Sequence, residues 1–257
     1  MKRLMVICLF LFFPTVSHAE IRSELITYKQ GDTVLEGYLA YDDAVAGRRP
    51  GVIVVHDWMG FSSFVQEKAK KLAELGYIAL AVDIYGEGVR PQNTDEAATQ
   101  AGIYKNDRDL LRRRAQAGYD VLKSCPFTDL HRIAAMGYCF GGTTVLEMAR
   151  SGLDLKGVVS FHGGLDTTHP EDARKIKAKV LALHGADDPY VPPQQVQAFQ
   201  KEMNDAKVDW QMIFYSGAVH AFTNKAAGND NSKGVAYNPK ADQRSWEAMK
   251  QFFEEIF

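Results

Sequence analysis

The chain has 257 residues, of which 46% are hydrophobic, and a formal net charge of −2 at pH 7, as expected for one large domain with a substantial core. Its basic residues form no stripe, and the short cluster Arg112–Arg114 is interpreted as a solvated helix face, so no nucleic-acid partner is expected. With three cysteines, the chain is not a disulfide-rich exported scaffold.

The first residues have the three parts of an export signal. Met1–Arg3 is basic, Leu4–Phe13 is apolar, and Ser17–Ala19 has the small-x-small pattern of a cleavage site. The apolar part is too short to be a stable membrane anchor. We therefore expect a signal peptide over residues 1–19 and a secreted, periplasmic mature domain over residues 20–257.

Beyond this segment, apolar runs alternate with helical patterns. The predicted strands are Val34–Tyr41, Gly51–His56, Ile78–Asp83, Arg132–Tyr138, Gly157–Phe161, Val180–His184 and Trp210–Tyr215. The predicted helices are Ser62–Leu75, Asp107–Ser124, Thr143–Ala149, Pro193–Asn204 and Asp242–Ile256. Most strands are continuously apolar, whereas 34–41 alternates loosely and suits an antiparallel edge. This rhythm predicts a single α/β domain with a mostly parallel central sheet and helices on both faces.

Two further segments and one cysteine lie between these elements. Residues 86–94 and 224–238 are expected to be exposed loops, and both are candidate pocket walls because sites in such sheets form beyond the carboxyl ends of the strands. Cys125 lies in a helix-to-strand turn, where we expect a free, partly buried thiol. The alternative is a Cys125–Cys139 disulfide, which would consume the candidate nucleophile described next.

The most informative motif is Gly137-Tyr138-Cys139-Phe140-Gly141-Gly142, between a predicted strand and a predicted helix. This is the context of a nucleophile elbow, a strained turn that exposes its central side chain. Glycines are needed two residues before and after because a Cβ there would collide with neighbouring backbone. A helix N-terminus favours the reactive thiolate, so Cys139 is the candidate nucleophile. The alternative is a buried structural cysteine in a glycine-rich turn.

A candidate acid and a candidate base follow at later strand ends. The run Val180–His184 leads into Asp187 and Asp188, and the residues alone do not separate these two acids. His220 lies just after the strand Trp210–Tyr215 and before the last helix. The chain order nucleophile, acid, histidine is one that hydrolytic triads use.

The remaining histidines and the oxyanion donors complete the candidate site. His56, His162 and His184 each end an apolar strand and suit buried supporting roles. No histidine pair has the spacing His-x-x-x-His, so no metal site is expected. A tetrahedral intermediate needs donors where negative charge develops, and the backbone N–H groups of Phe140 and Trp58 are the candidates.

Taken together, these residues resemble the dienelactone hydrolase family of the α/β-hydrolase superfamily. The resemblance covers nearly the whole mature chain. It rests on the cysteine motif at 137–142, on Gly185-Ala186-Asp187-Asp188-Pro189-Tyr190-Val191-Pro192, and on Ala218-Val219-His220-Ala221-Phe222. The segments 76–85 and 160–163 are also similar to the family pattern.

The resemblance implies roles for individual residues. In the family pattern the acid lies just before the x-x-Val-Pro element, which selects Asp188 over Asp187. Family members carry a glutamate that holds the resting thiol, and Asp57, one methylene shorter, occupies its position. Tyr85 and His162 are the other candidates for contacting the thiol or the substrate.

The resemblance also bears on the substrate. The named dienelactone hydrolases bind the substrate carboxylate with two arginines, and this chain has Glu87 and Asn224 at those positions. Arg90 is close enough in sequence to replace the first. Losing both would remove bidentate, charge-assisted contacts to an acid group, so dienelactone itself is not the expected substrate.

We therefore expect a hydrolase of carboxylic esters or lactones in which Cys139 attacks, His220 transfers protons and Asp188 orients His220. The alternatives are a thioester or amide hydrolase on the same residues, and a redox-reactive thiol that would tolerate loss of His220. No cofactor is implied. The expected partner is a small-molecule ester or lactone, and the expected assembly is a monomer or weak dimer.

Overall fold

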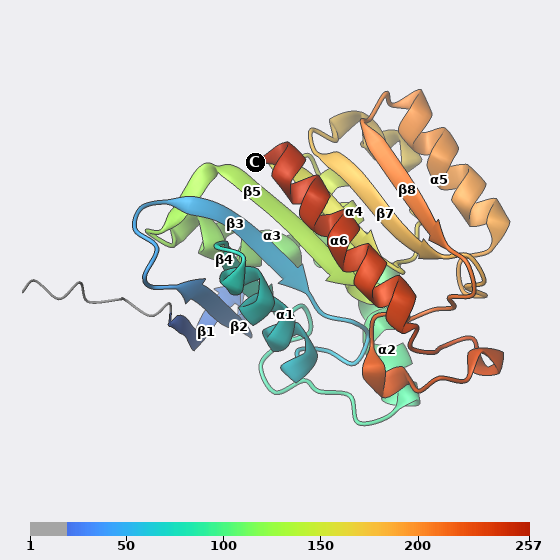
Figure 1. The fold of residues 1–257 in the computed structure, drawn as a ribbon, viewed down its shortest axis with the longest axis horizontal. Helices are drawn as coiled ribbons and strands as arrows, with labels where there is room; N and C mark the ends of the chain where they lie inside the picture. Colours follow the sequence, from blue (N-terminus) through green and yellow to red (C-terminus); the bar gives the residue numbers. More distant parts are fainter. Residues whose placement is uncertain (1–19) are drawn as a thin grey trace, which may run out of the picture.

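The computed structural model describes residues 20–257, so the predicted signal peptide lies outside the described residues. An eight-stranded sheet has the order β1-β2-β4-β3-β5-β6-β7-β8 (Figure 1). Its strands are β1 Ile21–Gln30, β2 Thr33–Asp42, β3 Arg49–Val55, β4 Ile78–Val82, β5 Thr128–Tyr138, β6 Gly157–Phe161, β7 Lys179–Gly185 and β8 Trp210–Tyr215. The pairs β1–β2 and β2–β4 are antiparallel and the others are parallel, which confirms the predicted mostly parallel sheet.

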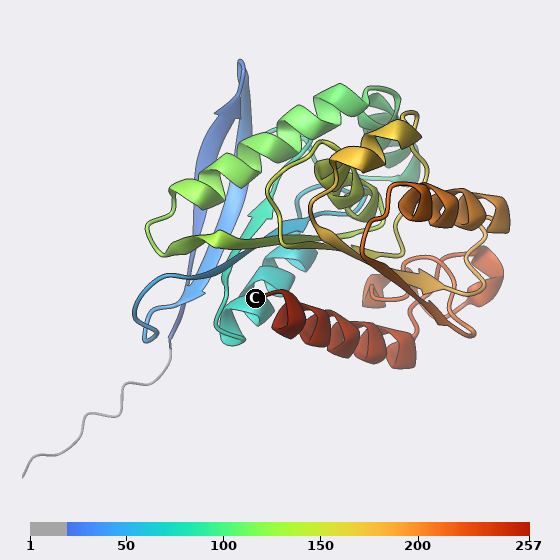
Figure 2. The same ribbon diagram turned by 90° about the horizontal axis from the view of Figure 1, so that it is seen from above.

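Helices cover both faces of this sheet. They are α1 Ser63–Glu74, α2 Thr94–Asn106, α3 Arg108–Ser124, α4 Phe140–Arg150, α5 Pro193–Asp205 and α6 Pro239–Ile256. Buried residues of α2, α3, α4 and α5 share one apolar core, and those of α1 and α6 share the other. Figure 2 shows α3 on one side of the sheet and α1 with α6 on the other. No helix within residues 20–257 is long and apolar enough to cross a membrane.

The central strands are apolar on both faces because both faces are covered. All residues of β4 and β6 are buried, as are the last five residues of β3 and the last six of β5. Burial of such side chains contributes about 25 cal/mol for each Å² of apolar surface removed from water. This is the pattern of a sheet sandwiched between helix layers, and it explains why the sequence predicted these strands well.

The antiparallel end of the sheet differs from the prediction. The segment 34–41 is antiparallel as expected, but as β2 it lies inside the sheet because β1 pairs with its other side. The strand β1 was not predicted because most of its residues are exposed and it lacks an apolar run. Its clearest signal is the two-residue turn Gly31-Asp32, where Gly31 has a φ of +56°, a turn typical of hairpins.

Two helices also differ from the prediction. The helix α2 was missed because it buries only Ala97, Ala101 and Tyr104, too few to give a clear apolar stripe. Its start is nonetheless encoded, since the Asn93 side chain accepts a hydrogen bond from the backbone N–H of Glu96. The helix α4 begins at Phe140 rather than Thr143, directly after the cysteine.

The fold gathers the candidate site residues at one edge of the sheet. Cys139 follows β5, Asp188 follows β7 and His220 follows β8. Trp58 and Tyr85 follow β3 and β4, which run parallel to those strands. Carboxyl ends of parallel strands meet at the same edge, so residues far apart in sequence become neighbours there.

Candidate active site

Cys139 occupies the sharp turn that the glycine-rich motif predicts. Its backbone has φ 54° and ψ −113°, between the last residue of β5 and the first residue of α4. Its N–H donates to the carbonyl of Phe161 at 3.0 Å, which fixes the turn against β6. A non-glycine residue at positive φ is strained, and such strain concentrates at functional sites.

The neighbouring glycines are required by close backbone contacts. A Cβ on Gly137 would lie 2.1 Å from the carbonyl oxygen of Gly141. A Cβ on Gly141 would lie 2.3 Å from the carbonyl oxygen of Val55, and one on Gly142 would lie 2.8 Å from the Cα of Gly163. The predicted need for glycine before and after the cysteine is confirmed by these distances.

The structure joins Cys139, His220 and Asp188 in one hydrogen-bonded chain. Nε2 of His220 lies 3.0 Å from Sγ of Cys139, and Nδ1 of His220 lies 2.8 Å from Oδ2 of Asp188. The other carboxylate oxygen of Asp188 accepts a hydrogen bond from the N–H of Tyr190 at 2.9 Å. Asp188 is buried, whereas the neighbouring Asp187 is exposed, so only the former faces the histidine.

The charges at this site favour a protonated histidine. Burial alone would lower the pKa of His220, but the negative charge of Cys139 and hydrogen bonds to Asp188 and Cys139 outweigh burial and raise its pKa to about 10. At neutral pH the ring is then an imidazolium beside the sulfur of Cys139. Such a pair holds both the nucleophile and the proton donor ready before substrate arrives.

The two candidate oxyanion donors are backbone N–H groups from two different segments of the chain. Phe140 is the first residue of α4, and Trp58 lies in the loop after β3. Neither N–H donates to a backbone carbonyl in the turns, loops and caps of residues 20–257. The hydroxyl of Tyr85 donates to the carbonyl of Trp58 at 3.0 Å and so fixes that loop. An N–H group without an acceptor, such as that of Phe140 directly after the nucleophile, can stabilise an oxyanion.

Tyr85 and Phe140 turn their rings toward the core. Their ring centroids lie 5.3 Å apart, and both pack on the ring of His56. Tyr85 is 4% exposed and Phe140 is 1% exposed, so both act mainly as walls beneath the site. Burial raises the pKa of Tyr85 far above its usual value, which keeps its hydroxyl protonated as a donor.

Asp57 does not hold the thiol in this structure. Its Oδ1 accepts a hydrogen bond from the N–H of Met59 at 2.9 Å, and so caps its own loop. The sulfur of Cys139 has His220 as its hydrogen-bond partner instead. The shorter side chain of aspartate, compared with glutamate, explains why it bonds locally. Burial raises the pKa of the Asp57 carboxyl.

His162 also differs from its expected role of contacting the thiol or the substrate. It is 2% exposed, and its Nε2 lies 2.8 Å from the hydroxyl of Thr223. Its ring packs edge-to-face on the ring of His220, with centroids 5.3 Å apart. His162 therefore packs against the ring of His220 on its buried side, where a substrate does not reach.

The positions suspected of binding a substrate carboxylate carry no free cation. Arg90 forms an ion pair with Glu36, and its Nη1 donates to the carbonyls of Gly86 and Val89 at 3.1 and 2.8 Å. The Asn224 side chain accepts a hydrogen bond from a nearby backbone N–H and so caps a short 3₁₀ helix, Lys225–Ala227. The structure therefore does not support Arg90 as a replacement for a substrate-binding arginine.

Sequence reasoning missed two supporting residues, Thr223 and Tyr190. The Tyr190 ring packs edge-to-face on the ring of His220 at 5.3 Å and is 58% exposed, so it covers the histidine from the solvent side. Both lie within three residues of a predicted site residue, and that proximity is the signal that could have found them. Cys125 is a free thiol, as predicted. Residues 20–257 contain no cluster of three ligands suited to a metal ion.

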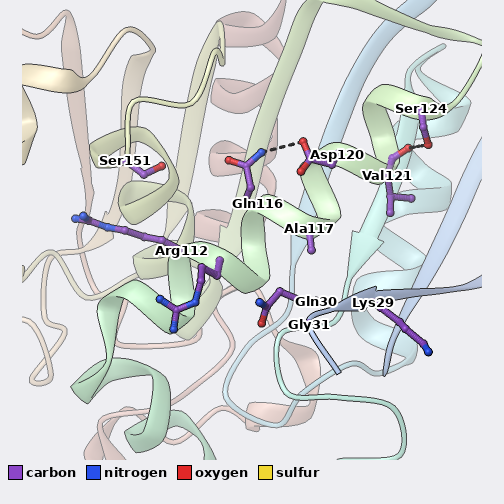
Figure 3. Close-up of a pocket in the computed structure, with 11 residues that line it drawn as sticks. Lys29, Gln30, Gly31, Arg112, Gln116, Ala117, Asp120, Val121, Ser124 and Ser151 are labelled. Carbon is purple, nitrogen blue, oxygen red and sulfur yellow. Dashed lines mark hydrogen bonds between the residues drawn. The ribbon is translucent and has the colours of Figure 1, made fainter. Parts of the chain in front are cut away.

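A separate hollow of about 710 Å³ lies between the β1–β2 hairpin and α3 and contains none of the site residues (Figure 3). Two of its polar side chains already have partners. Gln116 donates to Asp120 at 2.9 Å, and Arg112 pairs with Glu147 and Asp172. This hollow is therefore a surface feature of α3 and not a second arrangement of reactive groups.

Comparison with known proteins identifies the family to which the chain is similar. The sequence profile of the dienelactone hydrolase family matches residues 35–257. The solved structure m3DLH is 40% identical, with a TM-score of 0.89 over 92% of this chain and 99% of that one. A dienelactone hydrolase-like promiscuous phosphotriesterase from metagenomic libraries is 39% identical, with a TM-score of 0.88 over 93% and 100%. Protein usf of Aquifex pyrophilus is 29% identical over 90% of this chain and 98% of its own length.

Proposed function

Because the chain belongs to the dienelactone hydrolase family, whose members hydrolyse esters and lactones, we propose that it cleaves uncharged carboxylic esters or lactones with Cys139 as the nucleophile. The observation that carries this proposal is the hydrogen-bonded chain from Cys139 through His220 to Asp188. Its order along the sequence and its distances suit covalent catalysis by an activated thiol.

The first half of the reaction forms an acyl-enzyme. The thiolate of Cys139 attacks the carbonyl carbon and forms a C–S bond, and the N–H groups of Trp58 and Phe140 stabilise the oxyanion. The C–O bond then breaks, and the imidazolium of His220 gives its Nε2 proton to the leaving oxygen. With a lactone, the leaving hydroxyl stays attached to the acyl group.

The second half releases the acid. Neutral His220 takes a proton from water, and the resulting hydroxide attacks the thioester carbon. The intermediate collapses, the C–S bond breaks, and the thiolate of Cys139 returns beside the imidazolium. Asp188 keeps the histidine oriented and stabilises its charged form throughout.

The electrostatics of the surroundings support an uncharged substrate. Asp57 lies half-buried in the loop after β3, and Glu87 is exposed at the position where a substrate-binding arginine was sought. Arg90 is neutralised by Glu36. An anionic substrate would gain no bidentate contact from Arg90 or Asn224, whose side chains are engaged elsewhere, so a neutral ester or lactone fits better.

A second candidate activity is cleavage of phosphotriesters. It is favoured by the similarity to the promiscuous phosphotriesterase, which covers 93% of this chain. A phosphotriester is also uncharged and also develops negative charge on oxygen during attack, so the same two N–H donors would serve it. Thioesters and amides remain alternative acyl substrates for the same residues.

We further propose that residues 20–257 act as one exported domain after removal of residues 1–19. The support is the basic start, apolar core and small-x-small ending of that segment. Mass spectrometry of the protein purified from the periplasm should give an N-terminus at Glu20. An intact N-terminus in the cytoplasm would contradict this proposal.

The proposed activity is tested with a panel of p-nitrophenyl esters of increasing acyl length and an uncharged phosphotriester. Cys139→Ala and His220→Ala should each lower kcat by about 10³-fold or more, because they act as one catalytic unit. Cys125→Ser is the matched control, since this thiol lies outside the site and should leave hydrolysis unchanged. No turnover by wild type, with rapid and reversible oxidation of Cys139, would favour a redox-reactive thiol instead.

A further inference from the structure

Three residues of the loop that carries His220 converge on one buried side chain, His162. The ring of His220 lies edge-to-face on it, with centroids 5.3 Å apart. The ring of Phe222 meets it in the same way at 5.0 Å. The hydroxyl of Thr223 lies 2.8 Å from its Nε2. His162 follows β6, so the strand next to the one that carries Cys139 also supports the histidine loop.

The backbone of His162 is held in an unfavourable conformation. Its φ is +40°, in the region that residues other than glycine rarely adopt. Its N–H donates to the carbonyl of Leu183 at 2.8 Å, and its side chain is 2% exposed. Strain of this kind persists only where the surroundings fix it, and it concentrates where geometry matters for function.

We propose that His162 and Thr223 form a positioning pair for the reaction, in which a neutral imidazole held by the Thr223 hydroxyl fixes the ring of His220 where it reaches Cys139 and Asp188 together. This inference rests on the proposed function. It assigns a task to a buried histidine that neither touches the substrate nor transfers a proton.

The surroundings of His162 keep it neutral. Its pKa lies well below the ordinary value because burial disfavours the charged ring, and charged His220 acts in the same direction. The other titratable side chains near it are Lys68, His184 and Tyr138. Its Nδ1 has no hydrogen-bond partner among residues 20–257. The contact between Nε2 and the Thr223 hydroxyl is therefore the side-chain hydrogen bond that holds this ring.

Geometry explains why the pair matters to His220. Its imidazole must place Nε2 at 3.0 Å from sulfur and Nδ1 at 2.8 Å from a carboxylate at the same time. Ala221, the next residue, has a φ of +56°, so the chain turns sharply between His220 and Thr223. The hydrogen bond of Thr223, two residues beyond Ala221, therefore fixes the direction in which the His220 side chain points from the backbone. Small errors in such positions reduce rates strongly.

The main test compares two substitutions of Thr223. Thr223→Val keeps the shape and removes the hydroxyl, and we expect kcat to fall about tenfold with KM within about twofold, the effect of one lost hydrogen bond. Thr223→Ser restores the hydroxyl and should return kcat to near the wild-type value. Ser245→Ala is the stability control, because it removes another buried hydroxyl bond, on α6, outside the site.

A second variant tests His162 directly. His162→Asn suits the positive φ better than most residues, but it has no ring under His220 and a shorter reach toward Thr223. We expect a larger loss of kcat than in Thr223→Val. Combining it with Thr223→Val should cause little further loss, because both changes break the same contact.

A third readout separates positioning from simple stability. In a Cys125→Ser background, the rate of Cys139 alkylation by iodoacetamide is followed against pH for wild type, Thr223→Val and Thr223→Ser. A misplaced His220 stabilises the thiolate less, so the profile of Thr223→Val should shift to higher pH while that of Thr223→Ser should not.

Equal kcat values and equal alkylation profiles for Thr223→Val and Thr223→Ser would overturn the positioning role. A wild-type protein without esterase activity would instead refute the proposed function. The alkylation profile would still report whether Thr223 affects the imidazole beside Cys139, so the two failures are distinguishable.

Discussion

Cys139 lies in a turn whose shape is fixed by glycines within two or three residues, where any Cβ would strike backbone at 2.1 to 2.8 Å. His220 lies in a loop whose contacts come from far along the chain. Its backbone bonds to Gly234 and Ala236, its side chain bonds to Asp188, and its ring rests on His162. One half of the site is held by close backbone packing at glycines next to Cys139, and the other half by hydrogen bonds and ring contacts of the His220 loop.

This difference predicts how each half responds to substitution. A turn that is fixed by backbone collisions has no alternative arrangement, so changes there should abolish folding or activity together. A loop that is fixed by several separate contacts can lose one and keep the others. Changes there should lower kcat in steps while the protein remains folded.

The largest effect is expected for Gly141→Ala. The added Cβ would lie 2.3 Å from the carbonyl oxygen of Val55, a contact with backbone that no rotamer can relieve. We expect little soluble protein and no hydrolysis, measured by circular dichroism and ester turnover. Gly102→Ala is the matched control in α2, where nothing lies within 4 Å, and it should stabilise the protein by up to about 1 kcal/mol. A folded, active Gly141→Ala protein would contradict the role assigned to close backbone packing.

The second effect is the contrast between two adjacent acids. Asp188→Asn keeps the shape but should lower kcat by about 10³- to 10⁴-fold, because an amide cannot stabilise the charged His220 ring. Asp187→Asn changes an exposed residue and should leave kcat within about twofold, as surface substitutions usually do. Steady-state kinetics on one ester measures both. Equal losses would show that the acid was assigned to the wrong residue.

The third prediction concerns pH. The pKa of His220 is raised from 6.5 to about 10 in the folded protein. Protonation of this ring therefore stabilises the folded state relative to the unfolded state. That stabilisation is fully present below about pH 6.5 and is lost as pH rises through about 10. The difference in unfolding free energy between wild type and His220→Gln should therefore shrink over this range, as measured by urea unfolding. A constant difference would mean that His220 is neutral near pH 7.

Much of the fold could be predicted because its signals are local. Short, mainly apolar runs such as Gly157–Phe161 are typical of strands covered on both faces. The strand β1 and the helix α2 were not predicted because neither has an apolar stripe, and each is held mainly by its neighbours. The position of β2 inside the sheet followed from the missed β1.

The site divides in the same way. Cys139 and its glycines could be read from sequence because spacing within six residues determines the turn. Choosing Asp188 over Asp187 as the acid that orients His220 required either a family pattern or a structure, since the two adjacent acids differ only in their burial. The side chain of Asp57 and the pairing of His162 with Thr223 depend on contacts between distant segments. No periodicity or spacing encodes such contacts.

The smallest effect tests the half of the site that carries His220, at Gly234. This residue has a φ of +74°, its carbonyl accepts the N–H of His220 at 3.2 Å, and a Cβ there would lie 2.8 Å from the ring of Pro189, next to Asp188. Gly234→Ala should displace the loop that carries Pro189 and Asp188. We expect kcat to fall by about threefold to tenfold, because small displacements of catalytic groups reduce the rate strongly. Gly228→Ala is the matched control, since Gly228 also has a positive φ, +71°, but nothing lies within 4 Å. It should lower stability through backbone strain alone and leave kcat unchanged. If both variants lost the same activity, strain in the loop would explain the loss, and the contact with the Asp188 loop would not.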